Sequence, residues 1–260
     1  MDSRLIIVEG LPCSGKSTTS RYIAEKLGMT FIDEGTNAHP ADYEFHAFLN
    51  REDMTSFSSD EQEKIFASAS ERVGGYVVPL GLFSGELFDK LLQHKIYDFL
   101  PWEAERPVML DKWREFVQNT IDKRYVFNCV LLQNPMCETM MRFGFDEAAS
   151  EAYIREICDI IKTLSPFVVY LYNTEVYDSV NRVSIERGDD WLNAVIDYHC
   201  CGEYGKSHGL NGFDGYITAL EERQRRELSI LDSIGIDSII IKDPQKDWDK
   251  AYADILNKLM

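Results

Sequence analysis

An eight-residue motif near the beginning of the sequence narrows the range of folds open to this chain. Residues 10–17 read GLPCSGKS and match the pattern G-x-x-x-x-G-K-[ST] in full. The apolar run of residues 5–8 precedes the motif, and a stretch with helical spacing follows it. A glycine-rich turn between a strand and a helix points backbone N–H groups at an anion, and the helix dipole adds positive potential. The motif therefore predicts a phosphate-binding loop in an α/β fold.

The side chains of this loop predict a bound nucleotide and its metal ion. Lys16 is expected to reach the β- and γ-phosphates of ATP, and Ser17 to place its hydroxyl on Mg²⁺. Cys13 is either a small loop residue or a redox-sensitive thiol. The nucleotide-binding residues expected from the motif are Gly10, Pro12, Cys13, Ser14, Gly15, Lys16, Ser17 and Thr18.

Acidic residues occur at two places where they can serve this loop. Glu9 directly precedes it and either orders the water ligands of Mg²⁺, beside Ser17, or holds N–H donors of the loop. Asp33 and Glu34 follow a second apolar segment, and ligands of an open α/β sheet bind at the carboxyl ends of strands. One of these two is expected to orient Mg²⁺ or to take the proton of the acceptor, the alternative being a turn or helix cap.

Charge limits the classes of partner. The 260-residue chain has 44 acidic residues against 27 Lys and Arg, a net charge of −17, which disfavours binding to nucleic acid or anionic lipid. No signal segment precedes the first strand, and no apolar run approaches the roughly 18 residues that span a bilayer. The six cysteines form no C-x-x-C pair. We expect a cytoplasmic protein whose partners are ATP and a small-molecule acceptor, and a homodimer is compatible with the sequence.

Apolar, β-rich segments alternate with helical patterns, as in a parallel sheet covered on both faces. The strands are expected at residues 5–8, 29–32, 125–132, 167–172 and 238–241. Helical patterns at residues 59–72, 85–99 and 107–123 lie in one long stretch. The sequence thus predicts a single P-loop three-layer α/β domain over residues 1–260 with about five strands. A helical insertion is expected at about 36–123, and a lid or substrate loop at about 182–215.

Three segments resemble known kinases. The opening IIVEGLPCSGKST is similar to the start of thymidylate kinases and deoxynucleoside kinases, where a strand ending Glu-Gly runs into the P-loop. The stretch SPFVVYLYNTEVYDSVNRVSIERG, residues 165–188, resembles their fourth core strand, turn and lid helix. The C-terminal IIIKDPQKDWDKAYADILNKL resembles their last strand, base-side loop and terminal helix. Together these segments cover roughly a fifth of the chain.

This resemblance implies a P-loop kinase that moves the γ-phosphate of ATP to a nucleoside-like or nucleotide-like acceptor. It makes Arg182 and Arg187 lid arginines that touch the phosphates, and it places residues 242–244 near the adenine. The third strand departs from the pattern, because deoxynucleoside kinases carry a Glu-Arg pair there and this chain reads FNCVLLQN without an acid. The alternative for both arginines is a surface ion pair with nearby acids.

Other polar residues have two readings each. Asp111 follows the short apolar run VML and has the form of a Walker-B acid, although it lies within the insertion. The segment 205–209 is either a closing loop or an ordinary polar turn, and His39 either contacts the acceptor or is structural. Four aromatic residues have two possible roles: they stack on a nucleotide base, or, as we favour, they pack in the core of the insertion. They are Trp102, Trp113, Phe116 and Tyr125.

Two rival functions remain open at this point. An antibiotic or other metabolite kinase shares the phosphate-binding parts and differs in its acceptor pocket. A nucleotide-dependent switch that engages a protein partner belongs to another class. The chain lacks the Asn-Lys-x-Asp motif by which switch GTPases read guanine, which argues against GTP.

Overall fold

The computed structural model describes residues 2–35, 37–120 and 122–260, and the chain divides into two compact units. The first unit combines Met1–Asp33 with Thr120–Met260, and the second is Glu34–Asn119. The first unit holds the phosphate-binding loop. Each unit is described by itself.

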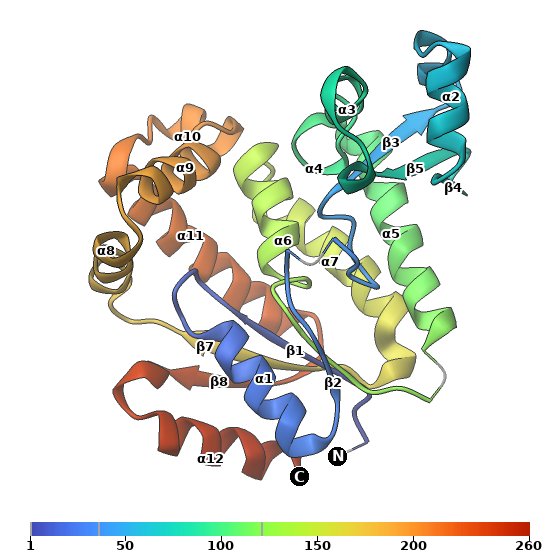
Figure 1. The fold of residues 1–260 in the computed structure, drawn as a ribbon. Helices are drawn as coiled ribbons and strands as arrows, with labels where there is room; N and C mark the ends of the chain where they lie inside the picture. Colours follow the sequence, from blue (N-terminus) through green and yellow to red (C-terminus); the bar gives the residue numbers. More distant parts are fainter. Residues whose placement is uncertain (1, 36, 121) are drawn as a thin grey trace. The chain divides into compact units, whose positions relative to one another are not determined.

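Among the described residues, five parallel strands form the sheet of the first unit in the order β2-β6-β1-β7-β8 (Figure 1). The strands are β1 Leu5–Gly10, β2 Thr30–Ile32, β6 Tyr125–Asn128, β7 Phe167–Tyr172 and β8 Asp237–Lys242. The strand that leads into the loop is therefore central, with β6 and β7 on its two sides. This arrangement confirms the predicted α/β fold with a five-stranded parallel sheet.

Helices cover both faces of this sheet (Figure 1). The helices α1 Lys16–Leu27 and α12 Trp248–Leu259 pack on one face. The opposite face carries α7 Glu147–Ile161 and α11 Gly212–Ser233, with the short α6 Gln133–Met136 beside them. The order of strand, loop and helix from β1 to α1 is the one that the sequence predicts.

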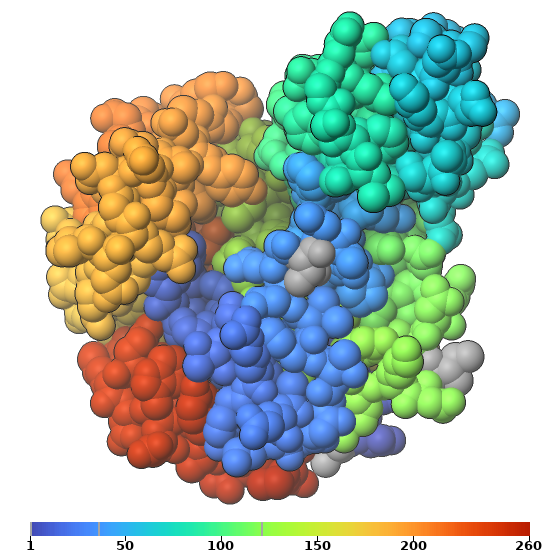
Figure 2. Space-filling view, viewed as in Figure 1, coloured from blue at the N-terminus to red at the C-terminus, as the bar shows by residue number. Residues whose placement is uncertain are grey.

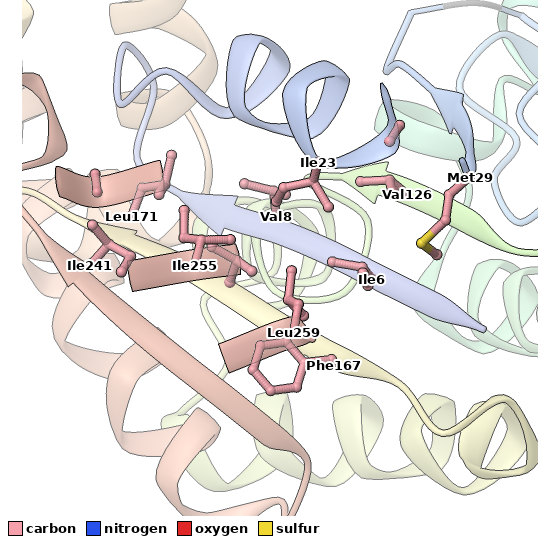
Figure 3. Packing of buried hydrophobic residues seen from close by; sticks show 13 residues of the cluster. Ile6, Val8, Ile23, Met29, Val126, Phe167, Leu171, Ile241, Ile255 and Leu259 are labelled. Carbon is pink, nitrogen blue, oxygen red and sulfur yellow. The ribbon is translucent and has the colours of Figure 1, made fainter. Parts of the chain in front are cut away.

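Apolar side chains from several elements fix the α1 and α12 face of the sheet (Figure 3). Val8 of β1 and Val126 of β6 lie in one cluster with Ile23 of α1 and Ile255 of α12, and all four are fully buried. Full burial of an aliphatic side chain of this size stabilises a fold by about 1.5–3 kcal/mol. The cluster therefore holds the helix that starts at the phosphate-binding loop firmly against its strand.

The third strand of the sheet is shorter than the sequence predicts. It ends at Asn128, whereas the apolar pattern continues to residue 132. Cys129 adopts a φ of 68°, and its N–H still donates to the carbonyl of Val8 at 3.1 Å. This left-handed residue turns the chain out of the sheet, so residues 129–132 are buried without being strand.

The second unit contains strands as well as helices, which the expectation of a helical insertion missed. Among its described residues, β3 His46–Asn50, β5 Gly75–Pro79 and β4 Ser70–Arg72 form an antiparallel sheet in the order β3-β5-β4. Its helices are α2 Ser59–Phe66, α3 Gly85–Leu92, α4 Ile96–Phe99 and α5 Trp102–Asn119.

The predicted helix over 59–72 is therefore wrong beyond Phe66. Val73 and Gly74 have φ angles of 50° and 77°, and they form the turn of the hairpin that joins β4 to β5. A Val in the left-handed region is uncommon, so pairing with β5 outweighs the local helical pattern here.

The segment expected to form a lid or substrate loop, at about 182–215, is largely helical. The helices are α8 Val176–Arg187, α9 Asp189–Cys200 and α10 Glu203–His208, followed by the start of α11. Gly205 lies inside α10, where a Cβ would come within 2.1 Å of the carbonyl oxygen of Cys200. This glycine therefore permits close packing and is not a hinge. A lid role for the whole segment stays a prediction.

None of the helices in the described ranges combines the length and apolar character needed to cross a bilayer.

Candidate functional site

The phosphate-binding loop depends on two glycines with positive φ. Gly10 has a φ of 140°, and a Cβ there would lie 2.5 Å from the carbonyl oxygen of Leu171 on β7. Gly15 has a φ of 91° and stands directly before α1, where a Cβ would meet the ring of Trp248. Both positions therefore exclude other residues, by backbone conformation and by space.

Lys16 begins α1 and is oriented into the loop. Its side chain is buried, and Nζ donates a 2.7 Å hydrogen bond to the carbonyl oxygen of Leu11. Leu11 lies inside the same loop, so the ammonium group lies against the loop backbone. Binding of phosphate oxygens by Lys16, which the motif predicts, stays a prediction.

Ser17, Asp33 and Asn128 form a triangle of hydrogen bonds at the end of the loop. The hydroxyl of Ser17 donates to Oδ1 of Asp33 at 3.2 Å. Nδ2 of Asn128 donates to Oδ1 of Asp33 at 2.9 Å and to the hydroxyl of Ser17 at 3.2 Å. Arg21, one turn along α1, pairs with the second oxygen of Asp33 at 2.9 Å. The carboxyl ends of β2 and β6 thus meet at the P-loop serine.

The sequence pointed to two of these three residues. Ser17 belongs to the motif, and Asp33 follows the second strand. The sequence does not predict Asn128, because the family pattern expects an acid after the third strand and this strand has none. Its signal was its position, since it is the polar residue that ends an apolar strand next to the central one.

These groups suit a magnesium ion held with a nucleotide. Mg²⁺ prefers oxygen ligands and is usually bound through one or two carboxylates together with substrate phosphates and water. Ser17 and Asp33 offer a hydroxyl and a carboxylate oxygen 3.2 Å apart, and the amide of Asn128 also carries an oxygen. Within the described ranges, three or more His, Cys, Asp or Glu side chains nowhere gather into a site for a metal alone. Ser17, Asp33 and Asn128 therefore fit a Mg²⁺ ion that binds together with the phosphates of a nucleotide.

Glu9, near the end of β1, is fully buried. Its carboxylate accepts hydrogen bonds from the backbone N–H groups of Leu131, Leu132 and Gln133, at 2.8, 2.9 and 3.2 Å. It thus holds the segment that follows β6, and not the N–H donors of the phosphate-binding loop. A role for Glu9 as a metal ligand stays a prediction, although these bonds already engage both of its oxygens.

A second buried carboxylate influences Glu9. Burial and, to a lesser extent, the negative charge of Glu227 on α11 raise the pKa of Glu9 to about 7, against the lowering effect of the three N–H groups. Glu227 is also fully buried; it accepts a 2.6 Å hydrogen bond from Tyr170 and lies 3.1 Å from Arg223. Two buried carboxylates thus influence each other here, which disfavours the charged form of Glu9.

The two predicted lid arginines lie on α8 and are both exposed. The guanidinium of Arg187 stacks over the ring of Trp191 at 5.1 Å. Burial raises the pKa of the Cys13 thiol, while the positive charges of Arg187 and Lys16 lower it. Arg187 is thus close enough to the phosphate-binding loop to act on a thiol inside it. For Arg182 the phosphate role stays a prediction.

The segment after β8 lies beside the same loop. Nε2 of Gln245 donates to the carbonyl oxygen of Cys13 at 3.4 Å, and the ring of Trp248 packs on Gly15. Asp243 has a φ of 47° and accepts hydrogen bonds from both the N–H and the hydroxyl of Thr174. Lys242, Asp243 and Pro244 line a pocket of about 360 Å³ that β8 and α12 complete. Contact between this pocket and an adenine stays a prediction.

Several sequence candidates fall elsewhere. Asp111 lies in the middle of helix α5, 3.7 Å from Arg72, so its interpretation as an acid that ends a strand is wrong. His39 is buried, with a pKa lowered to about 3 by burial and by Lys112, and its Nδ1 accepts from the N–H of Ala41. Trp113 and Phe116 are buried and pack edge to face at 6.1 Å. These three residues have structural roles within the second unit.

Glu34 is the first residue of the second unit and is exposed in a turn. Its role as a base stays a prediction. The segment 205–209 includes most of α10, where Lys206 lies 3.5 Å from Glu203 and His208 Nδ1 is 2.9 Å from the carbonyl oxygen of Tyr204. Its polar groups are thus engaged within the helix.

Comparison with known proteins gives only structural neighbours, since no protein-family model and no curated protein sequence matches the chain. One neighbour is a deoxyadenosine kinase from M. mycoides with bound dATP, at 16% identity and a TM-score of 0.45, with 98% of each chain covered. A thymidylate kinase from Candida albicans has 11% identity and a TM-score of 0.44, with 98% of this chain and 90% of that one covered. A sugar kinase from Janibacter sp. has 12% identity and a TM-score of 0.43, with 99% and 94% covered. All three are kinases. At these scores the function must be argued from the residues of the chain itself.

Proposed function

We propose that this protein is an ATP-dependent phosphotransferase that moves the γ-phosphate to a small-molecule acceptor. The observation that carries the proposal is the triangle of Ser17, Asp33 and Asn128, where three elements bring oxygen donors to the end of a complete phosphate-binding loop. Phosphoryl transfer requires positioning and charge neutralisation rather than covalent chemistry from the protein.

Each part of the site has a role in this scheme. The loop N–H groups and Lys16 would bind the β- and γ-phosphates, and Ser17 and Asp33 would hold Mg²⁺, with Asn128 orienting both. Bound Mg²⁺ would neutralise charge on the phosphate oxygens. Arg187, whose charge already acts on Cys13, would steady the transferring phosphoryl group, and Arg182 would assist from the same helix.

The contacts of Asp33 bear on the choice of base. Asp33 accepts from Ser17 and Asn128 on one oxygen and pairs with Arg21 on the other, so both oxygens are committed to the metal side of the site. Glu34, exposed in the turn that follows, therefore becomes the better candidate to take a proton from the acceptor hydroxyl.

The acceptor proposed first is a nucleoside or nucleotide. Support comes from the sequence resemblance of residues 6–18 and 165–188 to thymidylate and deoxynucleoside kinases. An antibiotic or metabolite hydroxyl is the competing acceptor, because kinases with this loop differ mainly in their acceptor pockets. A homodimer and a cytoplasmic location stay predictions.

The experiment that tests this function is ADP release from Mg-ATP with and without acceptors. Nucleosides, nucleoside monophosphates and hydroxylated antibiotics form the panel. Stimulation by one class supports a kinase and identifies its acceptor. ATP binding without stimulation by any class would favour the switch protein that engages a partner.

A further inference from the structure

We propose that Trp248 is a positioning residue for the phosphate-binding loop, holding Gly15 in the conformation that bound phosphates need. This inference rests on the nucleotide site proposed above. It adds a residue that lies outside the P-loop motif, at the start of the C-terminal helix α12.

The contact is a direct one between the indole ring and the glycine backbone. A Cβ built on Gly15 would lie 2.5 Å from Cη2 and 2.9 Å from Cζ2 of Trp248, so the six-membered ring rests on the Cα of the glycine. Gly15 has a φ of 91° and a ψ of 19°, immediately before Lys16. An aromatic ring against the Cα limits the other conformations that a glycine can adopt at low cost.

A second contact from the same segment reaches the other side of the loop. Gln245 lies three residues before Trp248, and its Nε2 donates to the carbonyl oxygen of Cys13 at 3.4 Å. Cys13 has a φ of 68°, so it too is held in the left-handed region. Segment 245–248 thus contacts the loop at both of these left-handed residues.

Helix α12 packs against α1, and this packing holds the indole of Trp248 in place. Figure 2 shows the two helices side by side on the surface of the first unit. The rings of Tyr252 and Tyr22 stack at 4.0 Å and 14°, and Tyr252 lies 5.4 Å from Trp248 in the same row. Ile255 then anchors the helix in the core of the sheet, where it is fully buried.

This arrangement predicts a loop that is organised before the nucleotide arrives. Phosphate oxygens need several N–H groups in one concave array, and a flexible glycine must be ordered at the cost of binding free energy. A ring that already restricts Gly15 reduces that cost. Removal of the ring should therefore weaken nucleotide binding more than it changes the chemical step.

The first test measures the Kd of Mg-ATP by calorimetry, in the full-length protein. Trp248→Ala is expected to raise the Kd about tenfold, and Trp248→Phe, which keeps a ring on Gly15, to stay within about twofold of wild type. In turnover, KM for ATP should rise in Trp248→Ala while kcat stays near wild type. The matched control is Ile255→Val, which loosens the same helix in the core and should lower Tm without changing the Kd.

The second test uses the tryptophan as a spectroscopic reporter. Nucleotide binding beside Gly15 should change the emission of Trp248, and Trp248→Phe should lose that part of the response while still binding Mg-ATP, the remainder coming from Trp191, which stacks on Arg187. This measurement needs only the ring-preserving variant, so it stands even where Trp248→Ala is poorly folded.

The outcomes separate this inference from the proposed function. Suppose that wild-type protein binds Mg-ATP. Equally tight binding by Trp248→Ala, or an unchanged emission response in Trp248→Phe, then overturns the positioning role and leaves the kinase proposal intact. A wild-type protein that binds no Mg-ATP overturns both. A Kd that rises equally in Ile255→Val reduces Trp248 to a general packing role and also contradicts the inference.

Discussion

The side-chain amide of Asn128 donates a 2.9 Å hydrogen bond to Oδ1 of Asp33, and this bond joins the end of β6 to the end of β2. The two strands are neighbours in the sheet, so their last polar residues meet beside Ser17. The site thus has one carboxylate and one amide where two acids would repel each other. The amide keeps Asp33 aimed at the serine hydroxyl without adding charge.

Replacement of Asn128 by Asp should make the folding stability depend on magnesium. Two carboxylates in hydrogen-bond range repel each other, so Asn128→Asp is expected to lower Tm in EDTA by several degrees. Mg²⁺ with ATP should restore more stability in this variant than in wild type, because the added charge favours the cation. Thermal unfolding with and without Mg-ATP measures both effects. An equal Tm for Asn128→Asp and wild type in EDTA would contradict the hydrogen-bonded contact between residue 128 and Asp33.

Asp33→Asn should separate metal binding from nucleotide binding. The carboxylate oxygen 3.2 Å from Ser17 is lost while the size of the side chain is kept. We expect the Mg²⁺ concentration for half-maximal activity to rise about tenfold or more, with a smaller change in ATP affinity. Magnesium titrations of turnover give this number. An unchanged requirement would remove Asp33 from the metal site.

Glu34→Gln tests the base. If Glu34 takes the acceptor proton, kcat should fall by about 10²-fold or more, and the Mg²⁺ requirement should stay near wild type. Glu63→Gln, on α2 of the same unit and exposed like Glu34, is the matched control for the loss of one carboxylate. A wild-type kcat in Glu34→Gln would move the role to Asp33 or to another acid.

Much of the first unit could be predicted from sequence, since its strands are buried on both faces and read as continuous apolar runs. The predicted bounds of β7, residues 167–172, agree with the structure. The second unit was harder to predict, because its short strands depend on partners distant in sequence: β3 pairs with β5 across helix α2 and strand β4. The hairpin turn at Val73 carries no sequence signal of its own, as β-branched residues disfavour positive φ.

The candidate site also has residues that could be predicted from the sequence and residues that could not. Lys16 and Ser17 belong to a motif whose spacing is local, so they could be predicted directly. Asn128 and Trp248 reach the loop only through the sheet and through helix packing, over sequence separations that local patterns do not record. The role of Glu9 was open for a similar reason, since its partners lie at residues 131–133.

Arg187→Ala should reduce kcat more than Arg182→Ala. Arg187 stacks on Trp191, and its charge acts on Cys13 in the loop. An arginine that neutralises the transferring phosphoryl group contributes about 10³-fold or more to kcat, so Arg187→Ala should lose that factor. Arg187→Lys should recover little, because an ammonium lacks the planar fork. Steady-state kinetics of the three variants decide this, and equal, small losses in all of them would argue for surface ion pairs.

The raised pKa of Glu9 predicts a dependence of stability on pH. In the folded protein Glu9 holds its proton up to a pKa of about 7, against 4.5 for an ordinary glutamate, so the folded state binds more protons between these values. Its contribution is therefore full below pH 4.5 and is lost as pH rises through 7, by about 3 kcal/mol in all.

Glu9→Gln isolates this contribution, because glutamine does not titrate. Urea unfolding at about pH 5 and about pH 8 should show wild type losing more stability with rising pH than Glu9→Gln, the other titrating groups being common to both. The same pH dependence in the two proteins would place the pKa of Glu9 near its ordinary value.

The decisive measurement is transfer of the labelled γ-phosphate of ATP to an acceptor, with Lys16→Ala as the blank. Wild type should place the label on one acceptor class in a Mg²⁺-dependent reaction, and Lys16→Ala should abolish transfer with an unchanged Tm, because Lys16 faces the loop and not the core. Label that reaches only inorganic phosphate, or transfer that persists in Lys16→Ala, would contradict the assignment of this chain as a P-loop kinase.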